Sequence, residues 1–304
     1  MNPFFTIIIP TYNRATKLPN AIQSVLEQTY TDFELIIIDD GSTDGTKEAV
    51  SGFKDERIRY VYQENAELSA ARNRGVNEAR GTYICFLDDD DIYLENHLVV
   101  LHDEIVSRNN PKEMYRTGLI TRRGEQETPG ILYGKNEHRL QFMWTHFVGN
   151  TTFCFPKEVF LQDQFSTQFL LFEDKHFLAR VLLKYDLVQI HAHTVIYNYN
   201  EDSRSITAYR DADRLKNQSA CLEDLFSTHG EELKNILGKH AKRRKRAVFD
   251  LQAAYQALRN KDWQYSKKHF RSAIAQYSKV DMMKSYFAFI VRYIMKKVVS
   301  IYSR

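Results

Sequence analysis

Residues 33–46 read FELIIIDDGSTDGT, an apolar, β-branched run that ends in two aspartates and a glycine-containing turn. A short apolar run bounded by turn residues is typical of a strand that is buried on both faces. Similar runs predict three further strands, at residues 4–9, 58–62 and 83–87. Segments with helical spacing of apolar residues lie between the strands, at residues 18–28, 46–53 and 68–80. Strands that alternate with helices predict βαβ units and a parallel sheet.

Polar side chains follow each predicted strand at its carboxyl end. They are Thr11, Tyr12, Asn13 and Arg14 after the first strand, Asp39 and Asp40 after the second, Glu64 and Asn65 after the third, and four aspartates at 88–91 after the fourth. The carboxyl ends of parallel strands lie along one edge of a sheet, where ligands bind. We therefore expect these residues to converge in space.

The four aspartates carry the clearest chemical signal. Adjacent carboxylates repel one another unless a cation or another partner offsets their charge. In an extended segment, Asp88 and Asp90 would point one way and Asp89 and Asp91 the other. Carboxylates at a sheet edge suit Mg²⁺ or Mn²⁺, which bind through one or two carboxylates together with phosphate oxygens. The alternative is a solvated acidic turn, or a set of caps for the next helix.

The turn at residues 39–46 has two readings as well. It can be a plain turn before a capped helix, since Gly41 and Gly45 are good turn residues. A carboxylate at its start can also accept a hydrogen bond from the N–H of a nucleotide base. In that case the ring of Tyr12 would be placed to stack on the base.

Composition excludes some classes of function. The chain has 304 residues, a formal net charge of +3 and three cysteines. So small a charge gives no reason to expect a nucleic-acid partner, and cysteines without metal-ligand spacing fit a reducing compartment. Neither a signal peptide nor a transmembrane run of about eighteen apolar residues is expected. These features predict a cytoplasmic protein.

The rest of the chain predicts a mixed region followed by helices. Helices are expected at 97–107 and 174–185, and strands near 114–121, 151–155 and 187–199. From residue 211 onward the pattern is helical, with a helical hairpin expected at 248–277. We therefore predict a catalytic domain at 1–210 and an α-helical extension at 211–304.

Two segments of the extension raise the question of membrane contact. The basic run HAKRRKR at 240–246 suits anionic lipid, or is a solvated helix face. Residues 282–304 mix aromatic and aliphatic side chains with lysine and arginine, which suits a helix lying in a membrane interface. The same segment could instead dock on the catalytic domain or on a second chain, as in a homodimer. A peripheral position on the inner face of the membrane is thus one of the alternatives.

The motifs in combination resemble the family 2 glycosyltransferases. The likeness is carried by FTIIIPTYNR (5–14), SVLEQTYTDFELIIIDDGSTDGT (24–46), SAARNRG (69–75) and FLDDDD (86–91), and more weakly by FEDKHFLARVLLKY (172–185). It implies an α/β protein with the GT-A fold, in which a Rossmann-like, mostly parallel sheet is flanked by helices. The helical C-terminal extension would follow this domain.

The resemblance also implies roles for individual residues. Pro10, Thr11 and Tyr12 would line the base of the nucleotide. Asp40 would accept a hydrogen bond from the imide N–H of uracil, with Asp39 beside it. Arg72 and Asn73 would lie near the base and the diphosphate. Asp88 and Asp90 match the DXD motif, with Asp90 as the direct metal ligand. Asp89 would face the ribose or the sugar. Asp174 matches the general base of the family. The alternative for Asp174 is the N-cap of a helix, and both readings can hold together. The family usually has glycine where this chain has Glu67, which puts the shape of that loop in question.

The function implied is inverting transfer of a sugar from a nucleotide-diphosphate sugar, with a UDP-sugar expected as the donor and Mg²⁺ or Mn²⁺ as the cofactor. The acceptor would be a hydroxyl of a glycan or a lipid-linked glycan, in the synthesis of a cell-surface polysaccharide. Two alternatives remain at this point: a sugar nucleotidyltransferase, and a non-catalytic protein that binds nucleotide sugars. The ending PTYNR of the first strand argues against the former, which usually needs a glycine-rich loop there.

Overall fold

The chain divides into two compact units, Met1–Ser203 and Arg204–Arg304. The computed structural model describes residues 2–109, 113–134, 137–146, 148–199, 212–259 and 261–277. The sequence had suggested a division after residue 210. The two units are described separately below.

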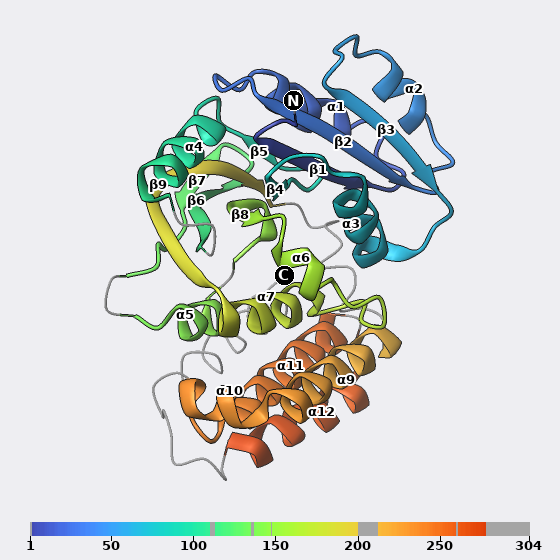
Figure 1. The fold of residues 1–304 in the computed structure, drawn as a ribbon. Coiled ribbons are helices and arrows are strands. Elements are labelled where there is room, and N and C mark those ends of the chain that lie inside the picture. Colours follow the sequence, from blue (N-terminus) through green and yellow to red (C-terminus); the bar gives the residue numbers. More distant parts are fainter. Residues whose placement is uncertain are drawn as a thin grey trace. The chain divides into compact units, whose positions relative to one another are not determined.

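The first unit is built on one mixed sheet of nine strands in the order β3-β2-β1-β4-β8-β6-β9-β5, with β7 paired to β6 (Figure 1). Its strands are β1 (Phe5–Thr11), β2 (Phe33–Asp40), β3 (Ile58–Gln63), β4 (Tyr83–Phe86), β5 (Ile92–Tyr93), β6 (Glu113–Arg123), β7 (Gln126–Pro129), β8 (Phe153–Pro156) and β9 (Asp186–Asn198). The first four strands pair in parallel, and β8 lies antiparallel between β4 and β6. The α/β, GT-A-like architecture expected from the sequence is confirmed.

Helices cover both faces of this sheet. They are α1 (Leu18–Leu26), α2 (Thr46–Ser51), α3 (Glu67–Glu78), α4 (His97–Arg108), α5 (Arg139–Thr145), α6 (Val159–Gln162) and α7 (Glu173–Lys184), with the short 3-10 helix η1 (Asn150–Thr152). One face packs against α1, α2 and α4 in a single apolar cluster. The other face packs against α3, α6 and α7 (Figure 1), where five phenylalanines contact one another. Burial on both faces explains why the first strands are continuously apolar.

Two glycines let α3 and the loop after it lie close to β1. A Cβ on Gly75 would lie 2.4 Å from the Cγ2 of Ile8, so only glycine permits this helix to pack so tightly. The helix ends at Glu78, two residues earlier than expected. Gly81, which was expected to end it, instead passes close to β1, where a Cβ would lie 2.6 Å from the backbone nitrogen of Thr6.

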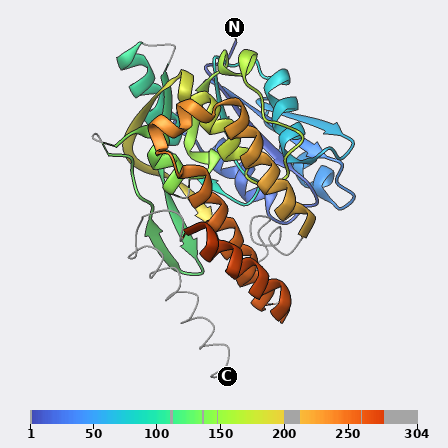
Figure 2. The same cartoon turned by 90° about the horizontal axis from the view of Figure 1, so that it is seen from below.

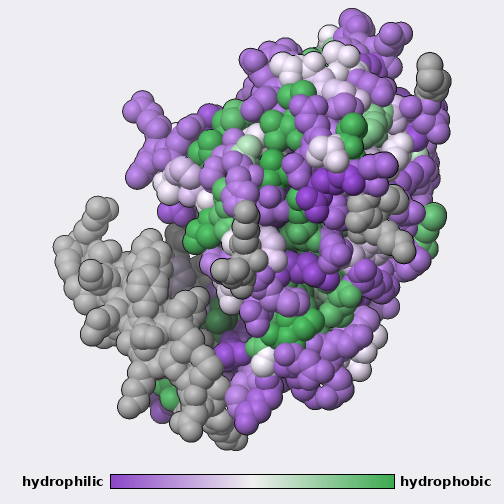
Figure 3. Space-filling model, turned by 60° about the vertical axis from the view of Figure 1, so that its left-hand side comes forward, coloured by the Kyte–Doolittle hydropathy of each residue, from purple (hydrophilic) through white to green (hydrophobic). Residues whose placement is uncertain are grey.

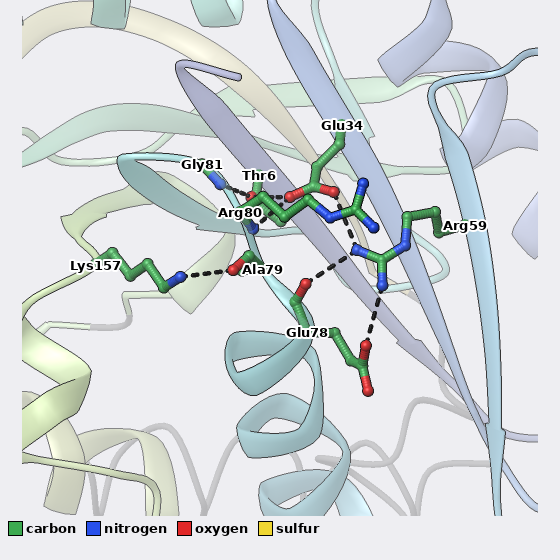
Figure 4. Close-up of polar contacts among 8 residues, drawn as sticks. All are labelled: Thr6, Glu34, Arg59, Glu78, Ala79, Arg80, Gly81 and Lys157. Atoms are coloured by element: carbon green, nitrogen blue, oxygen red, sulfur yellow. Dashed lines mark hydrogen bonds and ion pairs between the residues drawn. The ribbon is translucent and has the colours of Figure 1, made fainter. Parts of the chain in front are cut away.

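The C-terminal end of α3 is anchored by a polar network around Glu34 (Figure 4). Glu34 lies near the start of β2, and Asp39 and Asp40 lie at the other end of that strand. The Oε1 of the largely buried Glu34 accepts hydrogen bonds from the Thr6 hydroxyl at 2.8 Å and from the Arg80 backbone N–H at 2.6 Å. Its Oε2 pairs with Arg59 at 3.2 Å. Arg59 also donates to the backbone carbonyl of Glu78 at 2.9 Å and pairs with its carboxylate at 3.0 Å.

The last carbonyls of a helix have no partner within the helix and need donors from elsewhere. Arg59 supplies one donor, and Lys157 supplies another to the carbonyl of Ala79 at 2.6 Å. The network thus ties β1, β2, β3 and α3 together at one end, and fixes the helix whose other turns carry Arg72 and Asn73.

The second unit is helical where it is described. Its helices are α9 (Ala212–Thr228), α10 (Gly230–Leu237), α11 (Ala241–Arg259) and α12 (Trp263–Tyr277). Helices α11 and α12 form a hairpin (Figure 2), in agreement with the one expected at 248–277. Asp250 on α11 accepts hydrogen bonds from Ser272 and Gln276 on α12, at 2.6 and 2.8 Å.

Among the described residues, no helix has the length and apolar character needed to cross a membrane. On the face drawn in Figure 3, hydrophobic residues reach the surface as patches separated by hydrophilic ones. The segment 282–304, for which membrane contact is one of the alternatives, lies outside the described residues.

Candidate donor and catalytic site

The carboxyl ends of β1, β2 and β4 meet at one edge of the sheet. Thr11 at the end of β1 lies in register with Asp39 of β2. Its hydroxyl also donates a hydrogen bond of 2.8 Å to Asp89, which follows β4. The aspartates of the second strand and those of the fourth therefore flank the same short segment of β1.

The loop after β1 is fastened to the loop after β2. Asn13, at a φ of 53°, donates its backbone N–H to the Ser42 hydroxyl and accepts the Thr43 N–H, both at 2.8 Å. The Arg14 N–H donates to the Thr46 hydroxyl at 3.1 Å. These bonds hold Tyr12, whose side chain is half exposed, at the rim of the edge. Its ring is therefore available for stacking, whereas Pro10 is buried within β1.

Asp39 and Asp40 are both buried, but the structure engages them differently. Asp39 accepts the Ser42 N–H on one oxygen and the Tyr60 hydroxyl on the other, at 2.8 and 2.5 Å. Asp40 accepts two donors on Oδ1 alone, from Gln63 at 2.6 Å and from the Ala66 N–H at 2.9 Å. Among the described residues, no hydrogen bond reaches Oδ2 of Asp40. That oxygen is the one with capacity for a ligand.

Asn65 stabilises the turn that follows Asp40 at the end of β2. Its side chain donates to the carbonyl of Asp40 at 2.9 Å. Gly41 has a φ of 85°, and a Cβ there would lie 2.8 Å from the backbone nitrogen of Asn65. Only glycine is tolerated at such a position, because both the dihedral angle and the contact exclude a side chain. Asn65 thus supports the turn after β2 through its side-chain bond to the Asp40 carbonyl and through the close approach of its backbone to Gly41.

Glu67 keeps the backbone shape that glycine would take. Its φ is 71°, in the left-handed region. A non-glycine residue in that region costs on the order of 1 kcal/mol or more. The loop before α3 is therefore formed in spite of the departure from the family pattern, at the cost of local strain.

We expect Glu67→Gly to raise the free energy of unfolding by about 1 kcal/mol, because it relieves that strain. The measurement is a urea titration of both proteins. Glu67→Ala is the matched control, since it removes the same side chain and keeps the strained dihedral angle. Equal stability of the glycine and alanine variants would show that strain at this position is not what glycine relieves.

The aspartates at 88–91 do not alternate as expected for an extended segment. They form a turn, in which the Asp91 N–H donates to the Asp88 carbonyl at 3.0 Å. Asp89 and Asp90 consequently both lie near the segment after β1: Asp89 pairs with Arg14 at 3.7 Å and Asp90 with Lys17 at 3.9 Å. The expectation that Asp88 and Asp90 point one way, and Asp89 and Asp91 the other, was wrong because a turn bond replaces the extended backbone.

Asp91 is held away from the rim. It is buried, and one of its oxygens accepts the Asn198 N–H of β9 at 3.1 Å. Asn198 also donates its side-chain amide to the Asp90 carbonyl at 2.6 Å. Asp91 therefore ties the acidic turn to β9, and the other three aspartates remain for ligands.

The acidic turn carries more negative charge than its neighbours offset. Burial raises the pKa of Asp88, and nearby Asp174 and Asp90 add to the rise even though Arg72 opposes it. Burial, followed by Asp90 and Asp88, raises the pKa of Asp89 to about 7 against the Thr11 hydrogen bond and Arg14. Burial also raises the pKa of Asp91 well above its usual value, and no hydrogen bond from the described residues reaches its Oδ2. A cation would stabilise the ionised forms of these groups.

The donor set fits a divalent cation that is shared with a phosphate ligand. Among the described residues, no three His, Cys, Asp or Glu side chains are arranged to hold a metal ion by themselves. Mg²⁺ is usually bound in that open way, by one or two carboxylates plus phosphate oxygens, rather than in an all-protein cage. Asp88 and Asp90, two residues apart in one turn, meet that requirement.

Arg72 connects the acidic turn to Asp174, the predicted general base. Its guanidinium is fully buried and lies 3.2 Å from Asp88 and 2.5 Å from Asp174. Burial alone would lower its pKa, but Asp174 and Asp88 raise it above the ordinary value. The Asn150 side chain donates to the same oxygen of Asp174 at 2.8 Å. Two donors thus orient one carboxylate oxygen of Asp174 and leave the other one unshared by these bonds.

Asp174 lies in the first turn of α7 but does not cap it. The N-cap position is occupied by Phe172, at a φ of 70°, so Asp174 is the second residue of the helix. The alternative of a simple helix cap is therefore wrong in its strict form. Asp174 still lies at the positive end of the helix dipole.

Asn73 holds the backbone of Phe165, the residue whose ring lies against Arg72. Its amide donates to the Phe165 carbonyl at 2.8 Å and accepts the Phe165 N–H at 3.0 Å. The ring of Phe165 lies under the Arg72 guanidinium, with 5.3 Å between the guanidinium carbon and the ring centroid. Both polar groups of Asn73 are thus used to place the residue on which Arg72 stacks.

Two residues at this edge were not predicted. Lys17, at the start of α1, could have been suspected from the acidic turn that needs cations. Asn150 lies in η1, an irregular segment with no periodic pattern, and no signal in the sequence points to it.

Comparison with known proteins supports an assignment by sequence and by fold. The family described as "Glycosyl transferase family 2" matches residues 6–160. Glycosyltransferase GlyA of Streptococcus pneumoniae is 42% identical over 103 residues, which cover 33% of this chain and 15% of that protein. An uncharacterized glycosyltransferase of Rickettsia felis is 48% identical over 31% of this chain and 16% of its own length. The chain thus spans only about a sixth of these relatives.

Longer matches have lower identity. A GalNAc(5)-diNAcBac-PP-undecaprenol beta-1,3-glucosyltransferase of Campylobacter jejuni is 28% identical over 70% of this chain and 71% of its own length. The fold resembles TarS of S. aureus in complex with UDP-GlcNAc, with a TM-score of 0.59, 17% identity and 92% coverage of each chain. It also resembles mannosyltransferase PcManGT of Pyrobaculum calidifontis in complex with GDP-Man and Mn²⁺, with a TM-score of 0.61, 17% identity, and coverage of 98% of this chain and 87% of that one.

Proposed function

Because the chain belongs to glycosyl transferase family 2, we propose that it transfers a sugar from a nucleotide-diphosphate sugar to a hydroxyl of a glycan acceptor. The observation that carries the proposal is the buried Arg72, which lies within hydrogen-bonding distance of both the acidic turn and Asp174. A donor held at the turn and a base held at Asp174 would then lie on two sides of one guanidinium. That arrangement suits a displacement in which a hydroxyl attacks the donor sugar.

Binding of the donor would use the edge formed by β1, β2 and β4. The proposed base-side residues are Pro10, Thr11, Tyr12, Asp39, Asp40 and Asn65, with Asp40 as the acceptor of the base imide proton. Arg14, Arg72, Asn73, Asp88 and Asp89 would contact or support the diphosphate and sugar. A uridine nucleotide is favoured because its imide N–H matches a carboxylate acceptor.

The inverting reaction would need a general base for the acceptor hydroxyl and a positive charge to offset that of the leaving diphosphate. Asp174 would remove the proton of the acceptor hydroxyl as it attacks the anomeric carbon from the face opposite the leaving group. Arg72 and Asn150 would keep its carboxylate oriented. Asp90 and Asp88 would hold Mg²⁺ or Mn²⁺, whose charge would offset that of the leaving diphosphate. A solved structure of similar fold is a complex with GDP-Man and Mn²⁺, which supports this cofactor class.

The acceptor and the position in the cell are proposed from the relatives and the sequence. A relative of matching length acts, by its name, on an undecaprenol-linked glycan. We propose a glycan or lipid-linked glycan as the acceptor, in cell-surface polysaccharide synthesis at the cytoplasmic side of a membrane. A nucleic-acid partner is not part of this proposal.

The experiment that tests the proposed activity is a turnover assay with a panel of UDP-, GDP-, CDP- and dTDP-sugars, a lipid-linked glycan acceptor, and Mg²⁺ or Mn²⁺. Release of the nucleoside diphosphate together with a mass increase of one sugar on the acceptor is expected for one donor class. Use of nucleoside triphosphate and sugar phosphate, with release of pyrophosphate, would instead identify a nucleotidyltransferase and end the proposal.

Asp40→Asn is expected to weaken binding of UDP about tenfold or more, because a hydrogen bond to a charged acceptor is worth about 1.5–3 kcal/mol. Calorimetry with UDP measures the change. Asp39→Asn is the contrasting variant, since both oxygens of Asp39 are used by Ser42 and Tyr60. We expect that variant to lose stability in a urea titration. Unchanged UDP affinity in Asp40→Asn would remove Asp40 from the base site.

A further inference from the structure

The hairpin of α11 and α12 is strongly basic in a chain that is nearly neutral. The two helices contain nine lysines and arginines and a single acidic residue, Asp250, whereas the whole chain has a net charge of +3. The rest of the chain is therefore net acidic. The carboxylate of Asp250 is used within the hairpin, where it is hydrogen-bonded to His269, Ser272 and Gln276 of α12.

Helix α12 exposes part of this charge next to large apolar side chains. Trp263, Lys267 and Ile274 lie on one side of the helix, because their spacings of four and seven residues return to the same face. Trp263 is 53% exposed and Ile274 is 41% exposed, although most large apolar residues of the protein are buried. Lys268 and Arg271, also exposed, extend the same surface around the helix. No acidic residue occurs anywhere on α12.

We propose that this exposed face of α12, made of Trp263, Lys267, Lys268, Arg271 and Ile274, docks on the anionic surface of a lipid membrane. A helix that presents tryptophan and aliphatic side chains together with lysine and arginine is suited to the boundary between lipid headgroups and acyl chains. The lysine stems lie along the apolar surface while their ammonium groups reach the headgroups. Each cation near an anionic surface adds about 1 kcal/mol of attraction.

A negatively charged protein or a nucleic acid would match the cations but not the apolar residues between them. Isolated phosphate contacts gain nothing from Ile274, whereas insertion into a membrane buries it. The net acidic character of the remaining chain adds a reason why the hairpin, rather than another surface, would approach an anionic membrane. This inference concerns a surface of the second unit and does not depend on the proposed transfer reaction.

The test uses the two tryptophans of the chain, Trp144 and Trp263. In full-length protein with Trp144→Phe, fluorescence comes from Trp263 alone. We expect a blue shift that saturates on titration with vesicles of phosphatidylglycerol and phosphatidylcholine, and no shift with phosphatidylcholine alone. Co-sedimentation of the wild-type protein with the same vesicles provides a measurement that does not need the Trp144 substitution.

Lys267→Gln combined with Lys268→Gln is expected to weaken vesicle binding roughly 30-fold, the equivalent of two cations at about 1 kcal/mol each. Lys47→Gln combined with Lys54→Gln makes the same change of charge in the first unit and should leave binding within about twofold. Ile274→Ser should weaken binding without changing its salt dependence. Three results would each overturn the proposal. They are equal binding to both kinds of vesicle, unchanged binding after the α12 substitutions, and release from the vesicles by a single-stranded oligonucleotide. Because no nucleotide is needed, these outcomes are independent of whether sugar transfer is observed.

Discussion

Asp174→Asn is expected to lower the turnover number by about 10²–10⁴-fold, the usual contribution of a well-placed general base. The amide has nearly the shape of the carboxylate but cannot take a proton at neutral pH. Arg72 keeps Asp88 as a partner in the variant, so the donor side of the site should remain in place. Steady-state kinetics with saturating donor and acceptor measures the turnover number.

Binding of the donor separates this role from general damage to the site. In Asp174→Asn, we expect the affinity for the nucleotide sugar to stay within about threefold of wild type. Glu173→Gln is the matched control, because it removes one carboxylate from the neighbouring position on the first turn of α7. Its turnover should change far less. If Asp174→Asn transferred sugar at the wild-type rate, another residue would have to be the base.

Glu34→Gln is expected to lower the free energy of unfolding of the first unit by about 3 kcal/mol, the upper end of the cost of a buried polar group that loses its partner. The Oε1 of Glu34 accepts two hydrogen bonds and its Oε2 pairs with Arg59, and a neutral amide cannot serve all three donors. The glutamine would also turn an amide group toward Arg59 or toward the donors of Thr6 and Arg80. Urea unfolding in a Trp263→Phe background measures the change, since fluorescence then comes only from Trp144 in the first unit.

Asp55→Asn provides the control for that substitution. Asp55 pairs with Arg57 at 2.7 Å, and both side chains are partly exposed. An ion pair of this kind contributes about 1 kcal/mol or less. If Glu34→Gln shifted the unfolding midpoint no more than Asp55→Asn, the network at the end of α3 would not be an anchor.

The alternation of strands and helices was predictable because burial on both faces demands continuous apolar runs. β2 shows this most clearly: every residue from Phe33 to Asp40 is buried. Once the strands are known to be parallel, the convergence of their polar ends follows from the connection rules. The contact between Thr11 and Asp89 is the direct structural result of that topology.

The direction of individual side chains was less predictable. The turn at residues 88–91 depends on one backbone hydrogen bond, whose formation the run of four identical residues does not reveal. The strand β5, two residues long, and the four-residue helix α6 are too short to show a period. Asn150 reaches Asp174 because β8 returns antiparallel between β4 and β6, a pairing that depends on the whole chain.

Calorimetry of nucleoside diphosphate binding, with and without Mn²⁺, tests the central claim that carboxylates from separate strands hold a cation against a diphosphate. The account predicts that one nucleoside diphosphate binds the wild-type protein much more tightly when Mn²⁺ is present, and that Asp90→Ala loses this metal-dependent part while remaining folded. Metal-dependent binding of equal strength in Asp90→Ala, or tight binding that ignores the metal in both proteins, would contradict it.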